Sequence, residues 1–209
     1  MAERRYVPAA GHGFFLPLYD PMVKLAGGAR FVQTLIAQAE LQPGHLVLDI
    51  GCGTGTLAVA IKRAHPGVTV IGVDPDQPAL DRAMRKASRG GIEIRFDRGF
   101  ADALEYADAT FDRVFSSMMF HHLGRNDRSK ALSEVRRVLK PGGRLEFLDL
   151  AAGTHSFFAR MLHAPSVTQT GEDRMLARMR EAGLVNGART GTQSSIFGPL
   201  AFYQAAAPI

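Results

Sequence analysis

The chain has 209 residues, of which 46% are apolar and 22% charged, and its formal net charge is +5. This composition excludes an intrinsically disordered chain, because a sequence this apolar buries enough surface to offset the entropy lost on folding. The one cysteine, Cys52, excludes an intramolecular disulfide, and the lack of any apolar run near ~18 residues excludes a transmembrane helix.

The charge pattern points to a solvated surface. Residues Met1–Tyr6 carry charge without an apolar run behind them, which is not the pattern of a signal peptide. The cations are spread along the chain, which favours exposed helix faces over a nucleic-acid footprint. We therefore expect a soluble, cytoplasmic protein.

Glycine and proline divide the chain into short apolar runs and longer segments with helical spacing. The first helix is expected at about Gly28–Glu40. Five apolar runs predict strands at Leu46–Ile50, Val68–Val73, Ile92–Phe96, Phe111–Ser117 and Arg144–Leu150. Further helices are predicted at Thr54–His65, Asp76–Ser88 and Arg128–Leu139. The Lys-Pro-Gly-Gly sequence at 140–143 ends the last of these, because proline cannot continue a helix.

The last part of the chain breaks this alternation. A helix at Asp173–Ala182 ends at Gly183, and two strands follow, Val185–Ser194 and Ile196–Ala205. Two strands without a helix between them predict an antiparallel hairpin, whereas the earlier alternation predicts a parallel sheet with helices on both faces. The predicted fold is therefore α/β, with a seven-stranded, mostly parallel sheet and an antiparallel C-terminal hairpin.

A single domain, residues 1–209, is expected. Its core, 28–150, is preceded by a cap segment, 1–27, and followed by a lid insert, 151–171, and by the last helix and edge hairpin, 172–209. Both flanking segments carry aromatic residues, namely Tyr6, Phe14, Phe15, Tyr19, Phe157 and Phe158. They are expected to close over a cleft and shape an apolar or aromatic pocket, unless they only cover the core.

A glycine-rich loop follows the first strand and indicates a ligand site. Gly51, Gly53 and Gly55 bring bare backbone and the start of a helix against a ligand, at the sheet edge where α/β proteins bind. The dinucleotide fingerprint would place glycine at Thr56, so the spacing disfavours NAD, and the ending of a P-loop is absent. Asp74, which ends the second strand, can accept hydrogen bonds from ribose hydroxyls, or else serve as a turn residue ahead of a proline.

Five motifs then occur in order: Val47–Gly55, Val73-Asp74, Phe111–Val114, His121–Leu123 and Arg137–Gly143. With this order and spacing, the region from about Leu41 to Leu150 resembles the class I S-adenosylmethionine-dependent methyltransferases of the ubiquinone/menaquinone-biosynthesis type (methyltransferase type 11). The resemblance implies a Rossmann-like fold, S-adenosyl-L-methionine as cofactor and S-adenosyl-L-homocysteine as its product.

The resemblance also assigns the cofactor-binding residues. The methionine end of the cofactor is expected to bind to Asp49, Gly51, Cys52 and Gly53, with Asp49 near the ammonium group. The ribose is expected to bind to Asp74, with Pro75 beside it. The adenine is expected to bind to Gly99, Phe100 and Ala101. Phe100 stands where the family carries an acidic residue, so Asp102 is an alternative partner for the adenine amino group. Ser116 is expected under the sulfonium, offering its backbone carbonyl.

Two histidines after the fourth strand are candidate catalytic bases. A base helps only if the nucleophile is a hydroxyl, an ammonium or an acidic carbon. His122 matches the family position better and ranks ahead of His121, although both could instead orient the loop. Tyr6, Tyr19 and His155 are weaker candidates. No metal site is expected, because the histidines and the cysteine lack metal-ligand spacing.

The predicted function is an enzyme that transfers a methyl group from S-adenosylmethionine to a small-molecule acceptor, apolar or aromatic in character, at a C, O or N nucleophile. Nucleic acid is not expected as a partner, because Ser116–Met119 replaces the Asn/Asp-Pro-Pro-aromatic tetrapeptide of enzymes that methylate nucleic-acid amino groups. Two alternatives stay open, a methyltransferase acting on protein or nucleic acid and a cofactor-binding protein without transferase activity. A homodimer is compatible with the sequence.

Overall fold

The computed structural model describes residues 28–151, 172–195 and 198–209. The helices of these residues are α2 (Gly28–Gln38), α3 (Thr56–Ala64), α4 (Gln77–Arg89), η2 (Phe120–His122, a 3-10 turn), α5 (Arg125–Val138) and α7 (Glu172–Glu181). The strands are β1 (Leu46–Ile50), β2 (Thr69–Asp74), β3 (Arg95–Arg98), β4 (Phe111–Ser117), β5 (Leu139–Leu150), β6 (Val185–Ser195) and β7 (Gly198–Ala206).

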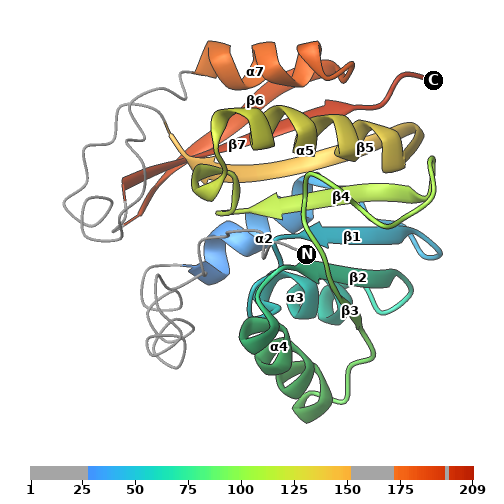
Figure 1. Cartoon of the computed structure of the whole chain (residues 1–209). Coiled ribbons are helices and arrows are strands. Elements are labelled where there is room, and N and C mark those ends of the chain that lie inside the picture. The colour runs from blue at the N-terminus through green and yellow to red at the C-terminus, as the bar shows by residue number, and fades with distance from the viewer. Residues whose placement is uncertain (1–27, 152–171, 196–197) are drawn as a thin grey trace.

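The strands form one sheet in the order β3-β2-β1-β4-β5-β7-β6 (Figure 1). The pairs between β3 and β5 are all parallel, whereas β7 runs antiparallel to both β5 and β6. The predicted Rossmann-like α/β fold with an antiparallel C-terminal hairpin is confirmed. The second strand of that hairpin lies inside the sheet, and the first forms its edge.

Apolar side chains of consecutive strand residues build a core on each face of the sheet. Val47 of β1 packs with Leu35 of α2 and with α3. The next residue, Leu48, points to the opposite face and packs in the core that includes Leu132 of α5 and Met179 of α7. Strands buried on both sides explain the near-continuous apolar runs in the sequence. No helix among the described residues is long and apolar enough to cross a membrane.

The largest differences between the predicted and observed strand boundaries are in the third and fifth strands. The third strand is Arg95–Arg98 rather than Ile92–Phe96, because its pairing with Ile71–Asp74 of β2 fixes the register. The fifth strand begins at Leu139 rather than Arg144, since Leu139 already has extended backbone and pairs with Phe111 of β4. The helix before it ends at Val138, one residue earlier than predicted.

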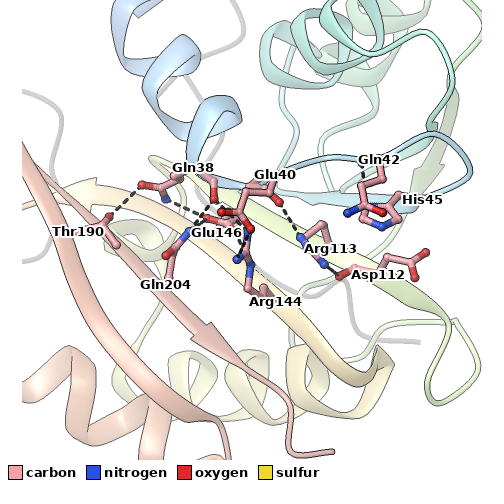
Figure 2. Close-up of polar contacts among 11 residues, drawn as sticks. Gln38, Glu40, Gln42, His45, Asp112, Arg113, Arg144, Glu146, Thr190 and Gln204 are labelled. Carbon is pink, nitrogen blue, oxygen red and sulfur yellow. Dashed lines mark hydrogen bonds and ion pairs between the residues drawn. The ribbon is translucent and has the colours of Figure 1, made fainter.

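A buried carboxylate lies on the face of the sheet below α2 (Figure 2). Glu146 of β5 is fully buried, and its Oε2 accepts hydrogen bonds from Nε2 of Gln38 and Nε2 of Gln204, each at 2.9 Å. Nε of Arg144 lies 3.3 Å from its Oε1. Glu146 therefore joins α2, β5 and β7 through one side chain.

The same cluster closes the C-terminal end of α2. The carbonyl of Gln38 accepts hydrogen bonds from Nη2 of Arg144 at 3.0 Å and from Nε2 of Gln204 at 2.9 Å. The carbonyl of Ala39 accepts one from Nε of Arg113 at 2.8 Å. These donors satisfy carbonyls that a helix leaves without partners at its end, so they fix α2 to β4, β5 and β7.

The predicted cap segment 1–27 and nearly all of the predicted lid insert 151–171 lie outside the described residues. Their proposed closure over a cleft, and the division of the chain that uses them, stay predictions. The described residues include the carboxyl ends of the parallel strands, where the candidate site lies.

Candidate functional site

The chain turns sharply between β1 and α3. Gly51, Gly53 and Gly55 have φ angles of +68°, +50° and +73°. A Cβ on Gly51 would lie 2.2 Å from Cγ of Met119. One on Gly55 would lie 2.8 Å from Cβ of Ala83. The loop therefore packs closely against α4 and the segment after β4, and both space and backbone conformation require glycine at these two positions.

Asp74 ends β2 beside this loop. Its Oδ2 accepts a hydrogen bond from the Gly53 N–H and its Oδ1 accepts one from the Asp76 N–H, each at 2.9 Å. Burial raises the pKa of Asp74, although these two donors act in the opposite direction. The backbone bonds hold the carboxylate in place, and each oxygen keeps a lone pair that can accept a hydrogen bond from a ligand hydroxyl.

Two further carboxylates are buried at this end of the sheet. Asp49 of β1 is 1% exposed and Asp76 is 3% exposed. The Oδ2 atom of each has no hydrogen-bond partner among the described residues. Burial and the Asp74 carboxylate raise the pKa of Asp49 to about 8. Because a buried carboxylate oxygen needs a donor or a cation, the site fits a positively charged ligand with N–H groups.

Cys52 and Pro75 lie in the same region. The Cys52 N–H donates to the Val73 carbonyl at 3.1 Å, and burial followed by the Asp49 and Asp74 charges raises the pKa of its thiol. A neutral, buried thiol suits a small-residue position in the loop rather than a reactive role. The Pro75 carbonyl accepts a hydrogen bond from Nε of Arg98 at 3.2 Å, which ties the end of β2 to β3.

The segment Gly99–Ala101 follows β3 and lies next to the end of β2. The Gly99 N–H donates to the Asp74 carbonyl at 3.2 Å, and Phe100 forms a single antiparallel bridge with Ala103. All three residues of the segment are partly exposed. The structure thus brings the predicted adenine segment beside Asp74, and the contact of Phe100 with a ligand ring stays a prediction.

Two side chains of α5 hold the residues that follow this segment. Nη2 of Arg137 donates to the Leu104 carbonyl at 2.9 Å, and Oε2 of Glu134 accepts a hydrogen bond from the Leu104 N–H at 2.7 Å. Nε and Nη2 of Arg137 both donate to Glu134 at 2.8 Å. Arg137 belongs to a motif noted in the sequence, but its partner is 33 residues away, so this role could not be predicted.

Ser116 lies at the end of β4, opposite Ile50 of β1 in the sheet register. It is fully buried, and its Oγ has no hydrogen-bond partner among the described residues. The glycine loop begins one residue after Ile50. Ser116 therefore lies beside the start of that loop, and its contact with a sulfonium stays a prediction.

His121, in the η2 turn after β4, contacts a buried carboxylate of β5. Its Nδ1 lies 2.6 Å from Oδ1 of Asp149, and its N–H donates to Oδ2 of Asp149 at 2.9 Å. The Leu150 N–H also donates to Asp149, at 2.8 Å. Burial opposes the ionisation of Asp149, but the charge and bond of His121 and the two backbone donors outweigh it and lower the pKa of Asp149. Asp149 therefore stays ionised and fixes the ring of His121.

His122 has a different environment. Its ring lies against that of His121, with the two ring centroids 4.0 Å apart. Burial, and then the neighbouring His121, lowers the pKa of His122 to about 4. His122 is therefore neutral at pH 7 and a weak base. As a general base, His121 is favoured by this geometry over His122, which the sequence analysis ranked first. The sequence signal for its partner is Asp149, an acidic residue near the end of the fifth strand.

The weaker candidates Tyr6, Tyr19 and His155 lie outside the described residues. Within the described ranges, no group of three or more His, Cys, Asp or Glu side chains is arranged to hold a metal ion. The remaining predicted residues lie together at the carboxyl ends of the parallel strands. The glycine loop and its carboxylates occupy the ends of β1 and β2, and the histidine pair occupies the ends of β4 and β5.

Comparisons with known proteins identify relatives of this chain. Residues 47–143 match a family model described as a methyltransferase domain. The chain is similar to the demethylmenaquinone methyltransferase of Thermus thermophilus, with 44% identity over 103 residues, which are 49% of this chain and 46% of that protein. It is similar to the 27-O-demethylrifamycin SV methyltransferase of Amycolatopsis mediterranei, with 33% identity over 164 residues, covering 74% and 59%. The chain spans about half the length of the curated relatives it matches.

Among solved structures, the chain is similar to phosphoethanolamine N-methyltransferase 2 of Haemonchus contortus, solved with phosphomonomethylethanolamine and S-adenosylhomocysteine. The TM-score is 0.82 at 16% identity, and the match covers 96% of this chain and 58% of that one. A likeness at this identity concerns the fold, which agrees with the sheet order and the antiparallel C-terminal strands.

Proposed function

We propose, on the premise that the chain belongs to the class I S-adenosylmethionine-dependent methyltransferases, that it transfers a methyl group from this cofactor to a small organic molecule. The observation that carries the proposal is the glycine loop beside three buried carboxylates, two of which keep an oxygen without a partner among the described residues. When bound, S-adenosylmethionine supplies a methyl group on a positively charged sulfonium.

In this proposal, different residues bind different parts of the cofactor. Asp74 accepts hydrogen bonds from the ribose hydroxyls, since backbone donors already hold its carboxylate in place. Asp49 and the glycine loop bind the amino-acid end, where a cation meets the open Oδ2 of Asp49. The segment Gly99–Ala101 binds the adenine, and the backbone at Ser116 faces the sulfonium. The burial of Asp49, Asp74 and Ser116 excludes water and strengthens the charged contacts there.

His121 acts as the general base for a hydroxyl acceptor. Asp149 bonds Nδ1, so Nε2 is the atom left to take a proton. As the acceptor oxygen takes the methyl group, its proton passes to Nε2 of His121. Support for an oxygen nucleophile comes from the relative whose name describes a missing methyl group on an oxygen of rifamycin SV. An apolar or aromatic acceptor, a homodimer and a cytoplasmic location stay predictions.

The function is tested by product detection. The protein is incubated with methyl-labelled S-adenosylmethionine and a panel of hydroxyl-bearing small molecules, including quinols, phenols and macrocyclic polyketides. Mass spectrometry then seeks an acceptor that has gained the label. Transfer to at least one hydroxyl is expected. Cofactor binding without a labelled product from any acceptor would favour a binding protein that lacks transferase activity.

Asp74→Ala should weaken the binding of S-adenosylhomocysteine by roughly 1–3 kcal/mol, because hydrogen bonds to a charged group are lost. Isothermal titration calorimetry measures the affinity, and a thermal melt records any change in stability. Asp127→Ala, which removes an exposed carboxylate in the first turn of α5, is the matched control and should bind as the wild type does. An unchanged affinity for Asp74→Ala would mean that the ribose is held elsewhere.

A further inference from the structure

Asp49 and Asp74 project from neighbouring strands toward the same face of the sheet. Asp49 pairs with Gly72 in the β1–β2 register, and side chains on a strand alternate between faces, so Asp74 points the same way as position 72. A Cβ on Gly72 would lie 2.8 Å from Cδ1 of Phe96 and 2.9 Å from Sγ of Cys52. The space next to Asp49 at position 72 is therefore filled by an aromatic ring and a buried thiol.

The charged groups around Asp49 do not neutralise it. On β2 its neighbour is the Asp74 carboxylate, which disfavours a second negative charge. On α3 the backbone of Ala58 favours the ionised form, but burial outweighs it. On α4, Nζ of Lys86 donates to the hydroxyl of Thr54 in the glycine loop at 3.2 Å and to that of Thr56 at the start of α3 at 2.8 Å. In the loop, the Cys52 thiol is neutral.

Two buried carboxylates of this kind cannot both keep their charge without a cation. We propose that Asp49 holds a proton in the free protein and releases it to solvent when a cationic group of the cofactor binds, so that binding liberates about one proton near neutral pH. The O–H bond of Asp49 breaks, the proton goes to the buffer, and the carboxylate pairs with the cation. This inference rests on the proposed function, because it needs a cationic ligand.

The pH dependence follows from the same geometry. Burial and Asp74 raise the pKa of Asp49 to about 8 in the free protein, and an adjacent cation lowers it. Below pH 8 the free protein must lose a proton to bind. Affinity for the cofactor should therefore rise about tenfold for each pH unit between pH 6 and 7, and level off above pH 8.

Calorimetry of S-adenosylmethionine binding at pH 7, in phosphate and in Tris, tests the proposal. The two buffers differ in ionisation enthalpy, so the difference in observed heat counts the protons released. The wild type should release about 0.9 proton per ligand, because a group with a pKa of about 8 is roughly 90% protonated one unit below it. Asp49→Asn should release close to none, with an affinity that no longer changes between pH 6 and 7.

Asparagine has the shape of the protonated carboxyl, so Asp49→Asn should fold as the wild type does. Asp127→Asn is the control, because Asp127 is an exposed carboxylate in the first turn of α5, outside the site. It should keep the proton release. Release of no proton by the wild type, or equal release by Asp49→Asn, would overturn the inference. Absence of any binding heat with the wild type would instead overturn the proposed function.

Discussion

Replacing His121 with asparagine should lower kcat for methyl transfer to a hydroxyl acceptor by about 10²–10⁴-fold, the range typical of a lost general base. The asparagine amide can still donate a hydrogen bond to Oδ1 of Asp149, so the anchoring contact is kept. What disappears is Nε2, the atom proposed to take the acceptor proton. Steady-state kinetics with the acceptor found by labelled transfer measures the change.

The affinity for S-adenosylhomocysteine provides the first control, because His121→Asn should leave it unchanged if the ring acts on the acceptor. His122→Asn is the matched variant. Its own pKa of about 4 makes His122 a weak base, so this substitution should lower kcat much less. A larger loss for His122→Asn than for His121→Asn would reverse the assignment and restore the order that the sequence suggested.

Local features of the site could be predicted because short stretches of chain determine them. A buried strand, three glycines and a helix start are contiguous in Val47–Ala64, and the structure places them as expected. Asp74 could be predicted as a site residue because it ends the strand that follows the glycine loop in the chain. Its carboxylate accepts a hydrogen bond from the Gly53 N–H of that loop. The fold followed from the alternation of apolar runs and helical segments, which depends on neighbouring residues alone.

Contacts between distant residues could not be predicted in the same way. The bond between His121 and Asp149 spans 28 positions and depends on β4 and β5 being neighbours in register. The sequence shows both residues but not that they meet, so this contact could not enter the ranking of the two histidines. The short strand β3 illustrates the same limit, because Arg95–Arg98 is polar at both ends and only its partner β2 selects its bounds.

The cluster around Glu146 is the clearest case of information that lies in the tertiary structure alone. Gln38 and Glu146 are separated by 108 positions, and nothing near either residue indicates a partner. A glutamate in an apolar strand would ordinarily be placed on an exposed edge. The structure instead buries it and surrounds it with an arginine and two amides.

Glu146→Ala should therefore lower the free energy of unfolding by about 1–3 kcal/mol, the usual penalty for leaving buried donors without their acceptor. The substitution removes the acceptor that the Nε2 groups of Gln38 and Gln204 share, and the carboxylate that lies 3.3 Å from Nε of Arg144. It also loosens the contact between α2 and the sheet. Chemical denaturation followed by circular dichroism, with the cofactor absent, measures the loss.

Glu40→Ala is the matched control for this change, because Glu40 pairs with the same Arg144 at 3.1 Å but its side chain is 74% exposed. Solvent screens that pair, so its loss should lower stability by less than about 1 kcal/mol. Glu146→Gln keeps an oxygen that can accept from both amides and should recover part of the loss. Equal effects of Glu146→Ala and Glu40→Ala would show that burial of the carboxylate does not set its contribution, and that α2 is held to the sheet by its apolar face alone.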